Sequence, residues 1–215
     1  MRRAALLLSV FFAVPALADT PEFQKGGVMI GLQYGWGLWN LDRAKLAGQV
    51  GDADAATLVG DTQNGHSANF SLGYNILGHA TIEATITGTG WNLTEGNRGG
   101  GGFITGAAHW HPIQIFLKDQ PRFYDASVFL GAGYGIMGEN RGIDGFVWQW
   151  GVDADIYFAK TLAVTVFYRS TQLNMNSFYI DYNNRRDPGN TVNLPQGSGG
   201  SFGQVGIGLR LRVSP

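Results

Sequence analysis

The chain has 215 residues, of which 14% are charged and 13% are aromatic, and its formal net charge is −1 at pH 7. A near-neutral chain has no excess of basic residues for a nucleic-acid surface, so we expect no nucleic-acid partner. The sequence contains no cysteine, which excludes disulfides as a source of stability.

The first 18 residues have the features of a secretory signal peptide. Two arginines precede an apolar run from Ala4 to Val14, and Ala16-Leu17-Ala18 provides a small-x-small cleavage site. The run is shorter than the roughly 18 to 20 residues that a membrane-spanning helix needs. We therefore expect a signal peptide over residues 1–18 and a single domain over residues 19–215.

Eight later stretches alternate apolar and polar residues with a period of two. This alternation sends successive side chains to opposite faces of a strand, and the lengths suit strands that cross a bilayer at a tilt. The pattern predicts an all-β fold, a transmembrane antiparallel up-and-down β-barrel of about eight strands. The expected strands are 26–39, 65–77, 79–92, 102–117, 123–138, 144–158, 161–176 and 201–213.

The connections between these stretches differ in length. Short turns are expected at Gly78, 118–122 and 159–160, intermediate loops near 93–101 and 139–143, and long loops at 40–64 and 177–200. Short periplasmic turns and longer external loops are typical of bacterial outer-membrane barrels. The pattern therefore predicts an integral protein of the outer membrane of a Gram-negative bacterium, with both termini in the periplasm.

Charged residues within the strands fall on the parity opposite to the lipid-facing apolar residues. Eight strands enclose an interior that side chains can fill, and an unpaired charge there would cost several kcal/mol. We expect the acids to pair with the arginines and to plug the lumen, in preference to a proton or ion path. The predicted lumen charge network consists of Glu83, Asp153, Asp155, Arg169, Arg210 and Arg212.

Aromatic residues gather toward the ends of the predicted strands, as in the aromatic girdles at the two membrane interfaces. The predicted girdle consists of Trp36, Trp91, Phe103, Trp148, Phe158 and Tyr168. A carbohydrate-stacking site at Trp39 or Trp91 is the less favoured alternative.

His109 and His111 form the one histidine pair, and they share the inward parity with Trp110 facing lipid. They could bind a metal or activate a serine such as Ser127, but lumen packing is the favoured interpretation. Pro112 predicts a bulge that shifts the phase and turns the apolar residues after it toward lipid, namely Ile113, Ile115 and Leu117.

The acids of the first long loop, Asp52, Asp54 and Asp61, could suggest calcium. An EF-hand-type loop would need another oxygen ligand at Ala56 and a glycine at Thr57, so we interpret this loop as a solvated acidic segment. We expect no metal and no cofactor.

Two segments carry a family resemblance. Val128–Gly135, VFLGAGYG, resembles the strand "apolar-G-x-G-Y" of small OmpA-like, OmpX-type outer-membrane barrels, and Gly151–Arg169 is similar to their penultimate hairpin. The resemblance implies an eight-stranded architecture and names no activity. Members usually end on an aromatic residue, whereas here the sequence after Val213 is Ser214-Pro215, which leaves room for an unusual assembly route.

These observations predict a non-enzymatic barrel with a structural or surface-interaction role, exerted through the loops 40–64 and 177–200. The expected partners are outer-membrane lipid and envelope proteins. One alternative is a subunit of a larger envelope complex for adhesion, gliding motility or secretion, and another is a transporter of small hydrophobic molecules. A lipid hydrolase would need a lipid-facing Ser/His pair, which the sequence does not offer.

Overall fold

A computed structural model describes most of the barrel wall and part of one long connection. The described residues are 26–41, 62–76, 78–93, 98–117, 123–138, 142–179, 186–194 and 199–213. The predicted signal peptide, the acids of the first long loop and the residues after Val213 lie outside them.

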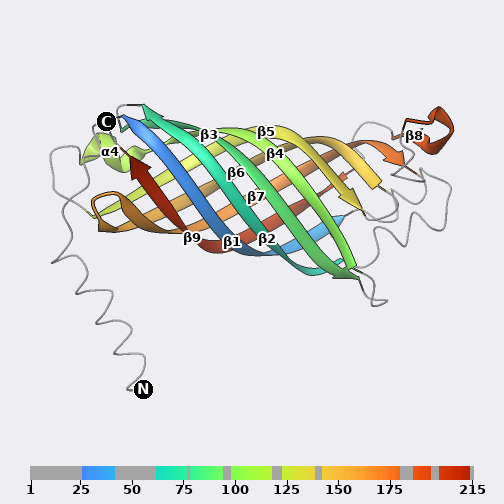
Figure 1. Ribbon diagram of the computed structural model, residues 1–215, viewed down its shortest axis with the longest axis horizontal. Helices are drawn as coiled ribbons and strands as arrows, with labels where there is room; N and C mark the ends of the chain where they lie inside the picture. The colour runs from blue at the N-terminus through green and yellow to red at the C-terminus, as the bar shows by residue number, and fades with distance from the viewer. Residues whose placement is uncertain are drawn as a thin grey trace, which may run out of the picture.

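Eight long antiparallel strands close into a ring (Figure 1). Each strand pairs with the next one along the chain, and β9 pairs with both β1 and β7 to complete the ring. The prediction of an eight-stranded antiparallel barrel is confirmed. The strands are β1 Gly27–Leu41, β2 Thr62–Ile76, β3 Ala80–Leu93, β4 Arg98–Trp110, β5 Tyr124–Gly138, β6 Gly142–Ala159, β7 Leu162–Tyr179 and β9 Gly199–Val213.

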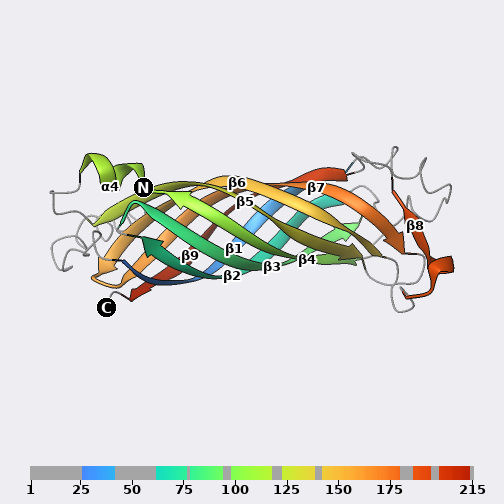
Figure 2. The same ribbon diagram turned by 90° about the horizontal axis from the view of Figure 1, so that it is seen from above.

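The two ends of the barrel carry different connections (Figures 1 and 2). One end holds the short turns, the end of β9 and the helix α4, Pro112–Phe116, whereas β8, Thr191–Asn193, lies at the other. The turn after β2 is tight because Gly78 adopts a φ of 78°, a conformation that glycine adopts without strain. Its backbone N–H donates to Asn75 Oδ1 at 2.8 Å.

The predicted fourth strand ends earlier than expected, so the prediction of a lipid-facing strand beyond Pro112 was wrong. The ladder ends with the His111 N–H, which donates to the His79 carbonyl at 3.0 Å. Proline has no N–H to donate to a ladder, and its fixed φ suits the first turn of a helix. Residues 112–116 therefore form α4 instead of a bulge. Within the described residues, no helix is long and apolar enough to cross a membrane.

The second long connection contains regular structure that the sequence did not predict. The 3-10 helix η3, Pro188–Asn190, begins where the Asp187 carboxylate accepts from the Gly189 N–H, and it leads directly into β8. The strand β8 pairs with Ser177–Tyr179 and thereby lengthens the sheet beside β7.

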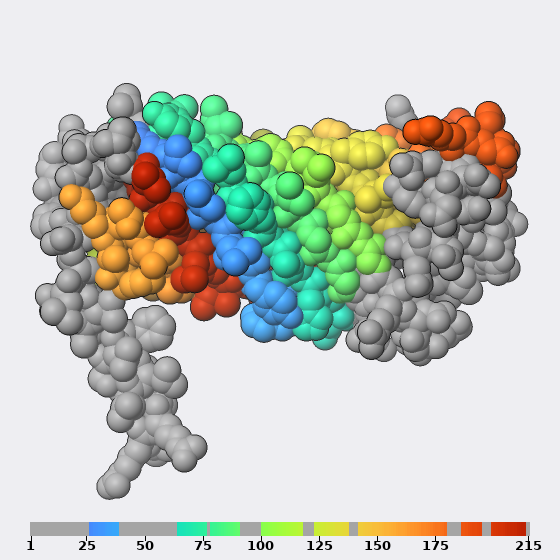
Figure 3. Space-filling view, in the orientation of Figure 1, coloured from blue at the N-terminus to red at the C-terminus, as the bar shows by residue number. Residues whose placement is uncertain are grey.

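The wall is apolar outside and mostly polar inside, the reverse of a water-soluble barrel. Leu32 and Leu130 are each 63% exposed on the outer face, whereas Gln33, Glu83 and Arg210 are buried in the lumen. Figure 3 shows the outer side chains of β9, β1, β2, β3 and β4 as a continuous surface. Closure gives each of the eight long strands a partner on both sides, so their backbone groups pair with one another without water. The apolar outer face suits lipid.

Candidate functional site: the charged lumen

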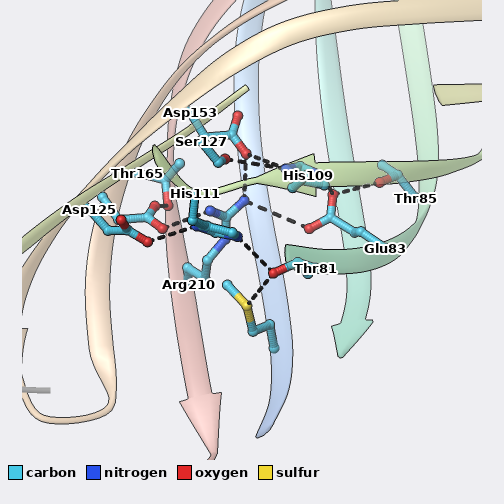
Figure 4. A network of polar contacts seen from close by, with 12 residues as sticks. Thr81, Glu83, Thr85, His109, His111, Asp125, Ser127, Asp153, Thr165 and Arg210 are labelled. Carbon is cyan, nitrogen blue, oxygen red and sulfur yellow. Dashed lines mark hydrogen bonds and ion pairs between the residues drawn. The ribbon is translucent and has the colours of Figure 1, made fainter. Parts of the chain in front are cut away.

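Arg210 on β9 is the centre of a buried ion cluster (Figure 4). Its Nη1 donates to Asp155 Oδ2 at 2.7 Å and its Nη2 donates to Asp153 Oδ2 at 2.8 Å. The Glu83 Oε2 atom, on β3, lies 3.7 Å from Nη2. Asp153 and Asp155 are two residues apart on β6, so both face inward and one guanidinium reaches both. The cluster therefore joins strands that are not neighbours in the sheet.

Two threonines and a histidine complete this cluster. Thr165 donates to Asp155 Oδ1 at 2.6 Å, and Thr85 donates to Glu83 Oε1 at 3.0 Å. The His109 ring lies between two of the acids, with Nε2 3.5 Å from Glu83 Oε1 and Nδ1 3.6 Å from Asp153 Oδ2. These contacts place four of the six predicted network residues in one group.

Arg212 belongs to a second chain of contacts nearer the short turns. Its Nη2 donates to Asn75 Oδ1 at 3.1 Å, and Asn75 Nδ2 donates to Thr81 Oγ1 at 3.0 Å. His111 bridges Thr81 and Asp125, with 2.8 Å between Nε2 and Thr81 Oγ1 and 2.8 Å between Nδ1 and Asp125 Oδ2. The end of the lumen nearer the short turns is thus filled by a polar chain that runs from β9 through β2 and β3 to β5.

Arg169 lies in a different environment. Its guanidinium carbon is 5.2 Å from the centre of the Phe129 ring and 5.6 Å from that of Phe167. Its Nε and Nη1 atoms have no hydrogen-bond partner among the described residues, although the side chain is fully buried. The contacts of the Arg169 guanidinium in the described lumen are thus with aromatic rings, while the charges of Asp153 and Glu83 act on it from a longer distance.

Neutral polar pairs fill the next part of the lumen. Gln149 Nε2 donates to Thr105 Oγ1 at 2.8 Å and Thr87 donates to Asn69 Oδ1 at 2.7 Å. The Ser67 hydroxyl donates to Gln204 Oε1. Each of these hydrogen bonds offsets part of the desolvation cost of the two atoms that it joins. Asn69 Nδ2 and both side-chain polar atoms of Gln33 are buried with no hydrogen-bond partner among the described residues.

Apolar side chains fill the end of the lumen nearer β8. Leu194, which directly follows β8, belongs to this apolar cluster. The described part of the second long connection therefore packs against this end of the barrel. The prediction that Phe103 belongs to the aromatic girdle was wrong, because it is 3% exposed and packs inside this cluster. The cluster consists of Phe103, Met137, Ile143, Val147, Leu173, Met175, Phe178, Leu194 and Phe202.

The remaining girdle residues lie on the outer wall where their side chains are described. Trp36, Trp148, Phe158 and Tyr168 are all between 38% and 51% exposed. The side chain of Trp91 lies outside the described part of the chain. An interfacial girdle formed by the four outward aromatics stays a proposal.

The histidine pair occupies the lumen, as the favoured interpretation expected. His109 Nδ1 lies 3.3 Å from Ser127 Oγ, so the structure brings together the serine and histidine considered as an alternative. Both side chains are buried among lumen residues and lie on the inner face, where the wall separates them from lipid. In the described ranges, no group of three or more His, Asp or Glu side chains is placed to hold a metal ion.

No protein-family model and no curated protein sequence matches this chain. Solved structures are similar to it in fold. OprG of Pseudomonas aeruginosa has a TM-score of 0.52 at 10% identity, covering 90% of this chain and 100% of that one. Ail of Yersinia pestis has a TM-score of 0.47 at 10% identity, covering 87% and 99% respectively. The N-terminal β-barrel domain of P. aeruginosa OprF has a TM-score of 0.43 at 10% identity, covering 87% and 100%.

At this identity the likeness to OprG establishes the fold alone. The fold is that of small outer-membrane β-barrels, in agreement with the apolar outer wall.

Proposed function

We propose that this chain is an integral outer-membrane barrel of the OmpA-like, OmpX-type family, with both termini in the periplasm and no enzymatic activity. Its filled lumen is structural. It interacts with envelope or surface partners through the outer connections 40–64 and 177–200.

The contents of the lumen support this proposal more than any other observation. Along β7 the inward side chains change from Thr165 near the short turns to Arg169 and then to Leu173 and Met175 near β8. A hydrated ion moving along this path would meet the Arg210 cluster and then an apolar cluster that offers it no ligands. Desolvation opposes such passage, which favours the outer connections as the places that recognise protein partners.

Planar-bilayer recording of the purified chain tests the structural lumen. A filled interior gives no stable conductance. Channels of uniform, well-resolved size would contradict it and favour a pore.

Excision of the connections tests the surface role. One variant replaces Asp42–Asp61 with a short Gly/Ser turn, and a second replaces Asp181–Arg185 in the same way, which retains η3, β8 and Leu194. We expect both to keep the heat-modifiable gel mobility of a folded barrel, because no described strand residue is removed. At least one should lose the partners captured by crosslinking in cells. Retention of every partner by both variants would favour a membrane-embedded subunit of an envelope complex.

Transport of small hydrophobic molecules is a second candidate, favoured by the apolar cluster at the outer end of the lumen. Uptake of a small apolar dye into vesicles distinguishes it. A transporter would accelerate uptake, and Val147→Trp, which would obstruct the outer lumen, would slow it. A structural lumen predicts the same uptake with and without the protein.

A further inference from the structure

An apolar groove crosses the outer wall over five neighbouring strands, from β5 through β6, β7 and β9 to β1. Its volume is about 760 Å³. The floor is backbone, because Ser127, Asp153, Phe167 and Gly206 lie opposite one another in register on successive strands. The side chains of the first three turn into the lumen, where they are buried.

Two rows of outward side chains form the sides of the groove. The row nearer the short turns consists of Ala126, Ala154, Val166 and Ile207, and the other consists of Val128, Val152, Tyr168, Val205 and Trp36.

Most of the side chains in these rows are small or β-branched, which keeps the space between the rows open. Larger side chains stand in the adjacent rows over β5 and β6. They are Leu130 paired with Trp150 on one side, and Tyr124 paired with Ile156 on the other. The contrast in side-chain size accounts for the hollow in a wall of otherwise regular strands.

A polar group adjoins the groove where Trp36 ends it. The rings of Tyr34 and Trp36 meet edge to face at 5.2 Å, and Tyr34 Oη lies 2.8 Å from His66 Nδ1. His66 is exposed on the outer face and lies opposite Trp36 in register. The barrel itself does not require a histidine at this outward position. Ionisable residues that face a membrane are costly and usually have a function.

We propose that the groove seats one hydrocarbon chain of a phospholipid whose phosphate is bound at His66 and Tyr34. Adjacent outward rows on the same strands are about 7 Å apart, which admits an alkyl chain but not a helix of about 10 Å diameter. The groove is lined by hydrocarbon along its length and adjoins an imidazole, a phenol and an indole at one end. A phospholipid is likewise divided into an apolar hydrocarbon chain and a polar headgroup at one end.

This lipid site requires the chain to lie in a bilayer, as proposed above. Native mass spectrometry tests it on the full chain purified into mild detergent from vesicles of palmitoyl-oleoyl phosphatidylglycerol. Ala154→Phe fills the middle of the groove. Ala132→Phe is the matched control, since Ala132 is also exposed on the outer wall, between Gly106 and Trp148, and does not line the groove.

We expect the unmodified chain and Ala132→Phe to retain one phospholipid each, and Ala154→Phe to retain at least about tenfold less. Equal retention by the two phenylalanine variants would overturn the site. Heat-modifiable mobility is measured for each variant and reports insertion of the barrel separately. A folded, inserted barrel that retains no lipid therefore refutes the proposed lipid site in the groove. It leaves the proposed location in the outer membrane unaffected.

His66→Ala tests the binding of the phosphate. We expect several-fold lower retention, with the fold unchanged because the side chain lies on the outer face. Unchanged retention in His66→Ala would refute the assignment of the phosphate to this end.

Discussion

Arg210 Nη1 on β9 and Asp155 Oδ2 on β6 are 2.7 Å apart inside the barrel, although β7 lies between these two strands in the sheet. With Glu83 on β3 at 3.7 Å, the same guanidinium reaches across the lumen to a distant part of the wall. The contacts of one arginine thus connect three parts of the ring that the hydrogen-bond ladder connects only through intervening strands.

Arg210→Met should destabilise the barrel strongly, because it leaves three buried carboxylates without their cation. Removing one partner of a buried ion group costs about 3 to 5 kcal/mol. Urea unfolding in vesicles, followed by tryptophan fluorescence, measures the free energy of unfolding. Adding Asp153→Asn and Glu83→Gln to Arg210→Met should recover part of the loss. Additive losses in the triple variant would show that the cluster is not coupled.

Arg169→Met should have a much smaller effect than Arg210→Met. Cation–π contact with Phe129 and Phe167 stabilises Arg169 by about 0.5 to 2 kcal/mol, and the burial of its unpartnered Nε and Nη1 offsets much of that gain. We expect a loss of about 1 kcal/mol or less in the same urea assay. A loss as large as that of Arg210→Met would place Arg169 in the ion cluster.

Leu130→Arg tests whether the outer wall faces lipid. A charged side chain on the lipid face near the midplane costs about 2 to 4 kcal/mol, so the folded fraction in heat-modifiable gels should fall. Leu130→Phe at the same position should fold like the unmodified chain. If the two variants fold equally well, the wall is not in contact with hydrocarbon.

Phe202→Ala should open a cavity in the apolar cluster at the end of the lumen nearer β8. Truncation of a fully buried phenylalanine costs about 3 to 5 kcal/mol. Phe116→Ala on α4 is the control, because that side chain is 78% exposed and should cost less than about 1 kcal/mol. Similar stabilities for both variants in the urea assay would mean that the cluster is loosely packed.

The strand pattern and its faces could be predicted because a period of two is a local property of the sequence. Asp153 and Asp155 share the parity of Gln149, and all three are buried in the lumen. Phe103 also has the inward parity of His109. Its neighbours Gly99–Gly102 have no side chains to set a phase, so its position near a strand end misled the prediction of a girdle residue.

The pairing within the lumen could not be predicted, since it depends on how far the strands are staggered around the closed ring. Nothing local distinguishes Arg169 from Arg210, yet one stacks on aromatic rings and the other binds carboxylates. The helix α4 was missed for a different reason. Residues Ile113, Ile115 and Leu117 alternate like a strand, and the loss of one ladder donor at Pro112 outweighs that pattern.

The position of Arg210 on the last strand gives the assembly of the barrel a definite final step. Its carboxylate partners lie on β3 and β6, which precede β9 along the chain. Until β9 pairs with β1 and β7, those acids lack the guanidinium that contacts all three of them in the closed ring. Ring closure and the pairing of those acids with Arg210 are therefore one event, so the last strand to join the sheet also delivers the cation that three carboxylates share.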